Sequence, residues 1–334
     1  MSFASDHPRA VLLGAQAAAM VLPVCDHYSG VPARMEKSLR LQAELAEEFG
    51  GTCMFDVTLD CEDGAPVGGE HAHAQAVAAL ARQARPGMRV AVRVHAPGHV
   101  AFEDDVATIV GEAAAHLCHV MVPKVEGPDD VTRAAQLVDQ AGGQALPLHV
   151  LIESPLAVHH AFEIAAHPRV QSLSFGLMDF VSAHGGAIDA EAMDSQGQFQ
   201  HPMVLRAKLA LAAACHAHGK TPSHCVVTEF ADPQAIRHAA QQARQLSYTR
   251  MWSIHPAQIR PILAAFAPRQ QAIDEAVQII EAAHAAQWAP ISFQGVLHDR
   301  ASYRYYWQVL ERAWRTGQPL PTLVRHWLND SPAP

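Results

Sequence analysis

The fold of this chain is decided by residues 147–180, PLHVLIESPLAVHHAFEIAAHPRVQSLSFGLMDF. Two short apolar runs, residues 148–152 and 173–175, are typical of strands buried on both faces, from which parallel sheets are built. Each run is followed by a lone carboxylate, Glu153 after the first and Asp179 after the second. Because ligands bind at the carboxyl ends of parallel strands, the two acids are either ligands of a divalent cation, Mg²⁺ first, or helix caps facing water.

Composition narrows the class of protein. The chain has 334 residues, of which 49% are hydrophobic and 17% charged, enough for one large α/β domain or two ordinary ones. A net charge of -9 argues against a nucleic-acid surface. Six cysteines without CxxC or metal-finger spacing predict a reduced, cytoplasmic protein. No apolar run reaches the roughly 18 residues of a membrane span, and Gln16 and Asp6 argue against a signal peptide over residues 11–24.

Strands and helices alternate along most of the chain. Apolar runs predict eight strands at residues 20–24, 53–59, 89–94, 119–125, 148–152, 173–175, 224–227 and 251–254. Helices are expected between them, at residues 32–49, 71–84, 103–117, 128–141, 202–218 and 233–246. This order predicts an α/β fold of the (β/α)₈ TIM-barrel type rather than a doubly wound sheet, because the GxGxxG motif is missing.

Two further features of the chain have more than one interpretation. Residues 182–201 are polar and too long for an ordinary loop after a strand, which suggests a lid or a substrate loop. The chain has 22 histidines, yet it has neither HExxH nor a His/Cys cluster, so most of them are read as solvated side chains rather than zinc ligands.

Charged residues also follow other predicted strands. Asp60, Glu62 and Asp63 lie within four positions after the second strand, either as a turn facing water or as part of a site. Arg93 ends the third strand, where a buried guanidinium is costly unless it is paired. It either grips an oxygen of a ligand or forms an ion pair with one of those acids for structure alone. Lys124 ends the fourth strand.

The C-terminal end of the chain is predicted to be a helical tail. We expect residues 1–268 to form the barrel domain, with an N-terminal extension over 1–19, and residues 269–334 to form a C-terminal helical extension. Helices are expected at 269–288 and 301–315, with a loop at 295–299. The tail carries many aromatic residues, so we expect it to pack on a neighbouring subunit of a homo-oligomer.

Several short motifs occur in a fixed order at the strand ends and on the first helix. They are MEKS at 35–38, DCED at 60–63, VRVH at 92–95, PKVE at 123–126, IESP at 152–155, FGLMDF at 175–180 and WSIHPAQI at 252–259. With these motifs, residues 20–315 resemble the HpcH/HpaI aldolase and citrate lyase family, and within it the citrate lyase β-subunit-like and malyl-CoA lyase-like branch.

The resemblance implies a TIM barrel of the phosphoenolpyruvate/pyruvate type that makes or breaks a carbon–carbon bond. The substrate would be a 3-hydroxyacyl-CoA thioester such as malyl-CoA or citramalyl-CoA, reacting through an enolate. Mg²⁺, or Mn²⁺ in its place, would hold the hydroxy or keto acid, and coenzyme A (CoA) would be part of the substrate. The resemblance also implies a trimer or a hexamer, with neither nucleic acid nor membrane as a partner.

Roles carry over to the positions that match the motifs. Glu153 and Asp179 would be the metal ligands. Arg93 would contact the substrate's oxygens and help to stabilise the enolate, while Glu62 and Asp63 would hold water molecules around the metal or orient the site.

Other positions bear on the substrate and on the neighbouring subunit. Lys124 would help to bind the substrate, and Asp299 in the tail would reach a neighbour's site and serve in proton transfer. The family usually has Asn where His95 stands and often Glu where Met178 stands. Both would border the reacting carbon and help to select the substrate. The family also has Leu at Cys61 and an acid near residues 223–224.

Other functions use the same residues. A thioesterase or a malate-synthase-like Claisen enzyme would use the same metal and enolate chemistry, and would release free thiol. A pyruvate-type aldolase would cleave a hydroxy keto acid without CoA. A non-catalytic ligand-binding member of the family would turn over none of these compounds.

Overall fold

The computed structural model describes residues 7–14, 17 and 20–329. The chain divides into two compact units, which are described separately here. One unit is the continuous segment 23–265, and the other combines the chain up to Leu22 with residues from Phe266 onward.

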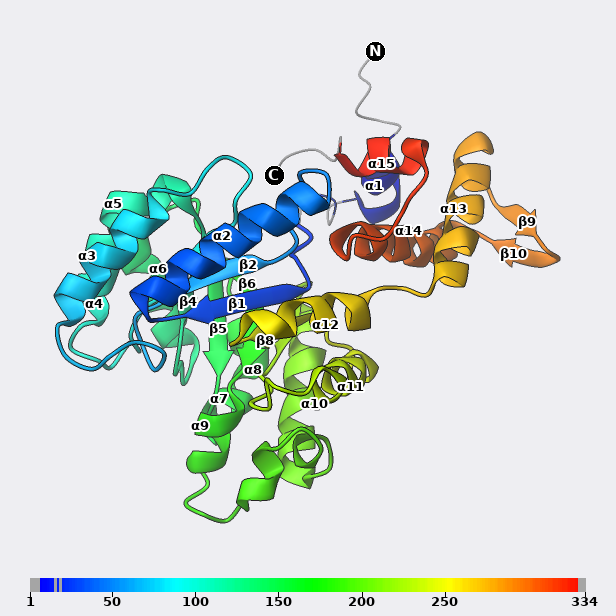
Figure 1. The fold of residues 1–334 in the computed structure, drawn as a ribbon. Helices are drawn as coiled ribbons and strands as arrows, with labels where there is room; N and C mark the ends of the chain where they lie inside the picture. The colour runs from blue at the N-terminus through cyan, green and yellow to red at the C-terminus, as the bar shows by residue number, and fades with distance from the viewer. Residues whose placement is uncertain (1–6, 15–16, 18–19, 330–334) are drawn as a thin grey trace. The chain divides into compact units, whose positions relative to one another are not determined.

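The 23–265 unit is a closed barrel of eight parallel strands in sequence order, which confirms the predicted fold (Figure 1). Its strands are β1 (Cys25–Ser29), β2 (Asp56–Asp60), β3 (Val90–Arg93), β4 (Leu117–Val122), β5 (Leu148–Ile152), β6 (Val170–Phe175), β7 (Thr221–His224) and β8 (Arg250–Ser253). β1 pairs with β8, so the sheet has no free edge. The carboxyl ends of all eight strands therefore meet at one end of the barrel.

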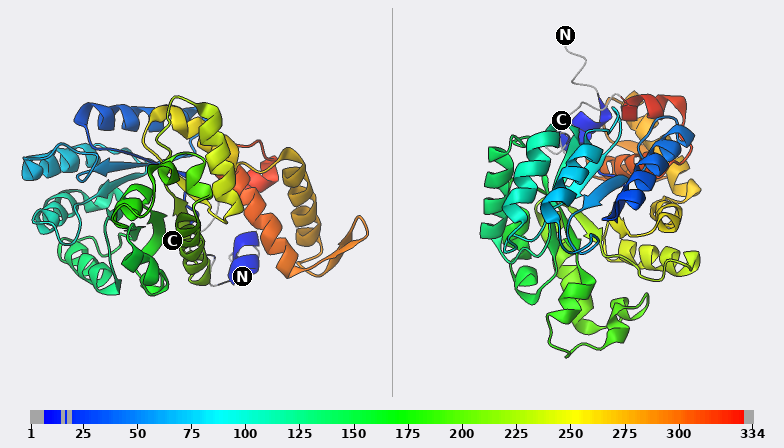
Figure 2. Two further views of the ribbon diagram at one scale, coloured as in Figure 1. Left: turned by 90° about the horizontal axis from the view of Figure 1, so that it is seen from below. Right: turned by 60° about the vertical axis from the view of Figure 1, so that its left-hand side comes forward.

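Helices cover the outside of the barrel (Figure 2). They are α2 (Pro32–Glu48), α3 (Glu70–Ala81), α6 (Pro128–Gln140), α7 (Pro155–His159), α8 (Ala161–Ala166), α10 (Pro202–Ala217), α11 (Pro233–Gln245) and α12 (Pro256–Phe266). Many of them begin with proline, whose fixed φ suits the first helical position. The helix expected over 103–117 is instead divided into α4 (Phe102–Asp105), a π-helical segment (Val106–Val110), α5 (Gly111–Ala113) and a 3₁₀ turn (Ala114–His116).

Two predicted strands were misplaced. The first strand is β1, after the predicted residues 20–24, and its polar residues are buried on both faces: Asp26 lies inside the barrel, while His27 contacts Ser38 of α2 at 3.0 Å. The seventh is β7, before the predicted 224–227. Pro222 disguised it, since proline lacks the N–H of a ladder, yet here its carbonyl accepts the amide of Thr249 at 3.3 Å.

A network of buried charges fills the barrel at the amino ends of the strands. Arg250 lies 2.8 Å from Asp26 and 2.6 Å from Asp56, and Arg89 donates to Asp56 at 2.5 Å. The side chains of Arg250, Asp26 and Asp56 are at most 2% exposed. Two carboxylates thus meet two guanidinium groups, so the charge of this network is balanced.

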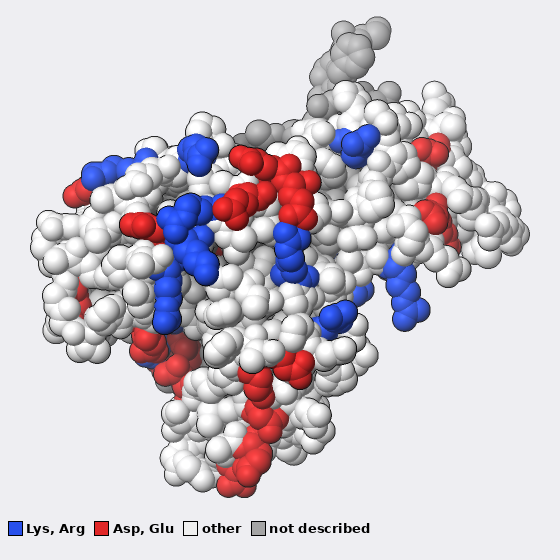
Figure 3. Space-filling model, viewed as in Figure 1, with Lys and Arg blue, Asp and Glu red and all other residues white. Residues whose placement is uncertain are grey.

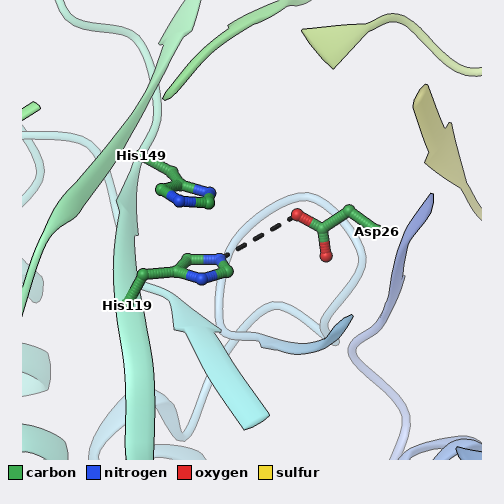
Figure 4. Close-up of side chains that lie close together, drawn as sticks. All are labelled: Asp26, His119 and His149. Carbon is green, nitrogen blue, oxygen red and sulfur yellow. Dashed lines mark ion pairs between the residues drawn. The ribbon is translucent and has the colours of Figure 1, made fainter. Parts of the chain in front are cut away.

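Two histidines stack beside this network. Figure 4 shows His119 and His149 one above the other, with Asp26 nearby. The ring centroids are 3.5 Å apart and the planes differ by 13°, while His119 Nε2 is 3.9 Å from Asp26. Although these three residues could be grouped as metal ligands, a metal binds in the plane of an imidazole ring. One ion cannot lie in two parallel planes, so this cluster is read as part of the packed barrel interior.

The second unit is mostly helical. It contains α1 (Pro8–Leu13), α13 (Gln270–Ala285), a hairpin of β9 (Ile291–Phe293) and β10 (Val296–His298), α14 (Arg300–Arg315) and α15 (Thr322–Asn329). The hairpin replaces the loop expected at 295–299. α1 packs on α14, and Arg9 of α1 pairs with the largely buried Glu311 of α14. The N-terminal segment, which the sequence assigned to the barrel domain, thus packs with the tail.

The aromatic residues of the tail mostly serve its own core. Tyr303 and Trp307 are fully buried among residues of α13, α14 and α15. We expected the tail to pack on a neighbouring subunit because it is rich in aromatic residues. Tyr303 and Trp307 do not support that expectation, because they are buried in the core of their own unit. Packing on a neighbour stays a prediction, and the exposed apolar residues of the unit include Leu297 and Tyr305.

The polar segment 182–201 follows α9 (Leu177–Ser182) and contains two 3₁₀ turns, Ala190–Met193 and Gly197–Phe199. Its end is anchored, because the buried Gln198 accepts a hydrogen bond from Lys208 at 2.7 Å and Phe199 stacks on His224. A role of this segment in substrate binding stays a prediction.

Figure 3 shows acidic and basic side chains in separate small groups on the face drawn. Among the described residues, no helix is long and apolar enough to cross a membrane.

Candidate active site

At the carboxyl end of the barrel, three of the predicted site residues, all acids, surround the ammonium group of Lys124. Its Nζ donates to Glu62 at 2.5 Å and to Asp63 at 3.1 Å, and lies 3.8 Å from Asp179. Burial acts to lower the pKa of Lys124, but the hydrogen bonds and charges of Glu62, Asp63 and Asp179 together outweigh it and raise the pKa above its ordinary value. Lys124 is therefore held as a cation among carboxylates.

The backbone of Lys124 ties the same residue to Glu153. Its amide donates to Glu153 Oε1 at 2.7 Å. Its φ of 50° lies in the left-handed region that residues with a side chain seldom adopt. Such strain persists only where the surroundings hold it, and here the amide and the ammonium group are both held by carboxylates.

Glu153 is the most deeply buried carboxylate of the predicted metal site. It is 5% exposed, and burial, followed by the charge of Asp179, raises its pKa to about 8. Gly176 makes room for it at the end of β6. A Cβ at position 176 would lie 2.3 Å from Glu153 Oε2. The close approach of β6 to Glu153 therefore requires glycine.

The carboxylate oxygens of this site fit a divalent cation. Glu153 and Asp179 are hard oxygen ligands of the kind that Mg²⁺ prefers, and the charge of Asp179 raises the cost of ionising Glu153. Asp179 lies in the first turn of α9 with its side chain 41% exposed, so a ligand can reach it. A cation of charge +2 would compensate the crowded negative charge, which Lys124 alone does not.

Arg93 is held by acids of the preceding strand. It donates from Nε and Nη2 to Asp60, at 2.6 and 2.5 Å, and its Nη1 lies 3.0 Å from Glu62. Its guanidinium carbon lies 5.0 Å from the ring centre of Tyr28 and 5.8 Å from that of Trp252. The sequence suggested an ion pair of Arg93 with a nearby acid, and the structure contains it. Asp60 binds Nε and Nη2 but not Nη1, so Nη1 can contact other groups.

A cavity of about 440 Å³ adjoins these groups. Its lining includes Glu62, Asp63 and Lys124 from the acidic cluster, and His95, His99 and Cys61 beside them. A volume of this size suits a small-molecule site, and the cavity places His95 in the same space as Lys124.

The remaining predicted site residues are Met178 and Asp299. Met178 precedes Asp179 on α9 and is half-buried. Asp299 belongs to the second unit and is exposed. There it caps α14, accepting a hydrogen bond from the amide of Ala301 at 2.9 Å in a capping box with Ser302.

Sequence reasoning missed three residues that shape this site. Asp60 was grouped with its neighbours, although it is the fully buried partner that orients Arg93. Gly176 gave no signal beyond its place in FGLMDF. Asp105, a fully buried acid in α4, binds His95 and was not singled out. A run of three acids at 103–105 within an otherwise apolar stretch was the available sign.

A family model described as HpcH/HpaI aldolase/citrate lyase matches residues 40–256. The chain belongs to this family. The match confirms the resemblance seen in the motifs and, with it, the expected enzyme class, a carbon–carbon lyase. Among curated relatives of this HpcH/HpaI member, the L-malyl-CoA/β-methylmalyl-CoA lyase of Cereibacter sphaeroides is 30% identical over 259 residues. That alignment covers 73% of this chain and 81% of the relative.

Solved structures agree with the fold of this HpcH/HpaI family member. A citrate lyase from Burkholderia xenovorans LB400 is 45% identical, covers 96% of this chain and 99% of its own, and has a TM-score of 0.78. The CitE protein of Mycobacterium tuberculosis, solved with magnesium, acetoacetate and coenzyme A, is 21% identical with a TM-score of 0.63. It covers 88% of this chain and 98% of its own, and its likeness supports the fold.

Proposed function

We propose that this protein is a Mg²⁺-dependent lyase that cleaves or forms a 3-hydroxyacyl-CoA thioester such as malyl-CoA or citramalyl-CoA. The observation that carries the proposal is the crowding of Glu153 and Asp179 at neighbouring strand ends, beside Lys124 and a cavity. The similarity to a malyl-CoA lyase supports a substrate of this class.

Glu153 and Asp179 are the residues that would hold the metal. When bound, Mg²⁺ supplies positive charge that polarises the oxygens of the hydroxy or keto acid. Gly176 keeps Glu153 in place from one side and the amide of Lys124 from the other. Glu62 and Asp63 orient Lys124 at the edge of the cavity, where its charge can attract an anionic substrate.

Arg93 is suited to the developing enolate. Asp60 fixes two of its nitrogens, so the direction of Nη1 is set before the substrate arrives. Such preorganised donors stabilise negative charge that develops during a reaction more effectively than mobile ones. We therefore assign to Arg93 the contact with the thioester oxygen.

Asp299 is proposed to complete the site from a neighbouring subunit of a homo-oligomer. Its exposed carboxylate and the exposed hairpin before it are available for such a contact. Mixing Asp299→Ala with Arg93→Ala subunits tests this. Hybrid oligomers regain activity if the two residues act in different subunits of one site, and regain none if each subunit is complete by itself.

The function is tested by incubating the protein and Mg²⁺ with a panel of 3-hydroxyacyl-CoA thioesters. Glyoxylate, pyruvate and oxaloacetate are measured separately from free thiol. We expect a keto acid and an acyl-CoA without free thiol, and activity that is lost in Glu153→Gln and Asp179→Asn. Glu163→Gln is the matched control, because Glu163 pairs with His160 at the surface.

Other outcomes identify the alternatives. Free thiol without a keto acid indicates a thioesterase, and free thiol with condensation of the acyl group indicates a Claisen synthase. Cleavage of a hydroxy keto acid in the absence of CoA indicates a pyruvate-type aldolase. Full activity in both metal-ligand variants would overturn the proposed site, and absence of turnover with every compound would favour a binding function.

A further inference from the structure

His95 and Asp105 form a histidine–carboxylate pair at the edge of the cavity. His95 follows β3 by two positions, and Asp105 ends α4. The amide and Nδ1 of His95 both lie within hydrogen-bond distance of Asp105 Oδ2, at 2.8 and 2.6 Å. The side chain of Asp105 is fully buried and that of His95 is 12% exposed. One carboxylate oxygen thus fixes both the backbone and the ring of His95.

This contact sets which ring nitrogen carries the hydrogen. A carboxylate oxygen accepts, so Nδ1 donates, and in the neutral ring the lone pair lies on Nε2. Among the described residues, Nε2 of His95 has no hydrogen-bond partner. His99 stacks on the ring at 4.3 Å with an interplanar angle of 11°, which restricts its rotation. A fixed ring with an open Nε2 is the arrangement that general acid–base catalysis requires.

The cavity brings this ring together with the rest of the site. His95 lines it along with Glu62 and Lys124, and those two residues contact each other. A substrate held at Lys124 therefore has the rings of His95 and His99 facing the same space, and of these two His95 is the ring that a buried carboxylate orients.

We propose that His95, oriented by Asp105, is the acid–base residue of the carbon–carbon bond reaction in this chain. The proposal rests on the proposed lyase function. Nε2 takes the proton of the 3-hydroxyl group as the bond between C2 and C3 breaks. The O–H electrons form the new carbonyl, and the electrons of the broken bond form the thioester enolate. The protonated ring then returns the proton to C2, so atoms and charge balance without a further reactant.

Two assays separate this role from the lyase function. The first is cleavage of the thioester panel. The second is exchange of the α-protons of acetyl-CoA and propionyl-CoA in D₂O with Mg²⁺, followed by proton NMR, which needs enolate formation but no cleavage. The variants are His95→Gln and Asp105→Asn. The matched control is His71→Gln, which removes an exposed histidine whose Nδ1 lies 2.7 Å from Asp104.

We expect His95→Gln to lower both rates at least about a hundredfold, in the range that acid–base groups contribute. Asp105 is a positioning residue, so Asp105→Asn should lower kcat at least about tenfold with little change in KM. His71→Gln should keep both activities. Retained stabilisation of the variants by the acyl-CoA, measured by thermal unfolding, shows that they fold and bind.

Each other result decides between the proposals. If His95→Gln cleaves and exchanges at wild-type rates, the role of His95 is overturned and the lyase function stands. If the wild type exchanges α-protons but cleaves no thioester, the lyase function falls, and loss of exchange in His95→Gln still supports the acid–base role. If the wild type does neither, both proposals are overturned.

Discussion

Both ends of the barrel interior carry charged side chains, and the two ends differ in how these charges are balanced. At the amino ends of the strands, Asp26 and Asp56 meet two guanidinium groups, from Arg89 and Arg250. At the carboxyl ends, the described residues place two cations, Arg93 and Lys124, among a larger set of acids. Those acids are Asp60, Glu62, Asp63, Glu153 and Asp179.

This difference separates a structural role from a functional one. A balanced, buried network satisfies its own charges and leaves nothing for a ligand. An excess of carboxylates in a partly buried space is costly by itself and becomes favourable when a cation binds. The pKa of Glu153, raised to about 8 by burial and by Asp179, measures that cost.

Removing a guanidinium group from the network at the amino ends of the strands should have the largest effect on stability. Arg250→Ala leaves Asp26 and Asp56 buried with one guanidinium group between them, and should lower the free energy of unfolding by about 3–5 kcal/mol. Urea unfolding measures it. The matched control is Arg260→Ala, which removes an exposed pair with Glu48 and should cost at most about 1 kcal/mol. Equal losses in the two variants would contradict the structural role of the network.

Replacing a carboxylate at the carboxyl ends of the strands by a neutral amide should instead raise stability. Glu153→Gln should lower kcat/KM at least about a hundredfold, because a metal ligand is lost. The same variant should unfold at a higher temperature than the wild type in EDTA, since the amide keeps the hydrogen bond from Lys124 without the buried charge. Thermal unfolding with and without Mg²⁺ checks this. A lower midpoint in EDTA would show that Glu153 contributes to stability as Arg250 does.

A methyl group at Gly176 tests how closely the unbalanced end is packed. Gly176→Ala places a Cβ 2.3 Å from Glu153 Oε2, which should cost about 1–3 kcal/mol and weaken the response to Mg²⁺. Gly111→Ala is the control, because its Cβ meets nothing within 4 Å and its φ of -56° is helical. Metal titrations followed by thermal unfolding compare the two. An unchanged Mg²⁺ response in Gly176→Ala would contradict the assigned position of Glu153.

The balanced end should also set the sensitivity to acid. Burial lowers the pKa of His149 to about 3, from 6.5 for an unperturbed histidine. Between these values the unfolded chain binds a proton that the folded chain excludes, so stability falls as the pH falls. His149→Gln should remove up to about 1.4 kcal/mol of this loss per pH unit. Urea unfolding at pH 7, 6 and 5 measures the difference, which should grow toward acid. A constant difference would indicate that His149 is not excluded from protonation.

The comparison also shows what the sequence could predict. Apolar runs and their spacing were sufficient to predict the barrel. Acids that follow those runs were sufficient to place Glu153, Asp179 and Glu62 at the carboxyl ends of the strands, and their roles stay predictions. The polar interior was not predicted, because Asp26 and Arg250 lie just outside the predicted strands and only their pairing shows that they are inside the barrel. The two are 224 positions apart in the chain, and only closure of the sheet brings β1 beside β8.

Partners within the site were hidden for the same reason. Arg93 looked like a substrate ligand from its place at a strand end, and the acid that orients it, Asp60, lies on the adjacent strand in register with it. The pairing of His95 with Asp105 depends on the short α4 helix, where the sequence predicted a longer regular one. Pairing across strands and loop geometry, rather than periodicity, decide these contacts.

Asp299 is the one predicted site residue in the second unit, and two substitutions separate its possible roles. Asp299→Ala removes the cap of α14 and should cost about 1 kcal/mol. Asp299→Ser keeps a capping oxygen and removes the carboxylate, so it should leave stability nearly unchanged. Thermal unfolding and thioester cleavage of both variants are measured together. If the carboxylate acts in the reaction, both lose activity equally. If Asp299 serves only as a cap, Asp299→Ser keeps the wild-type rate, and the acidic cluster of the barrel acts without a carboxylate from the tail.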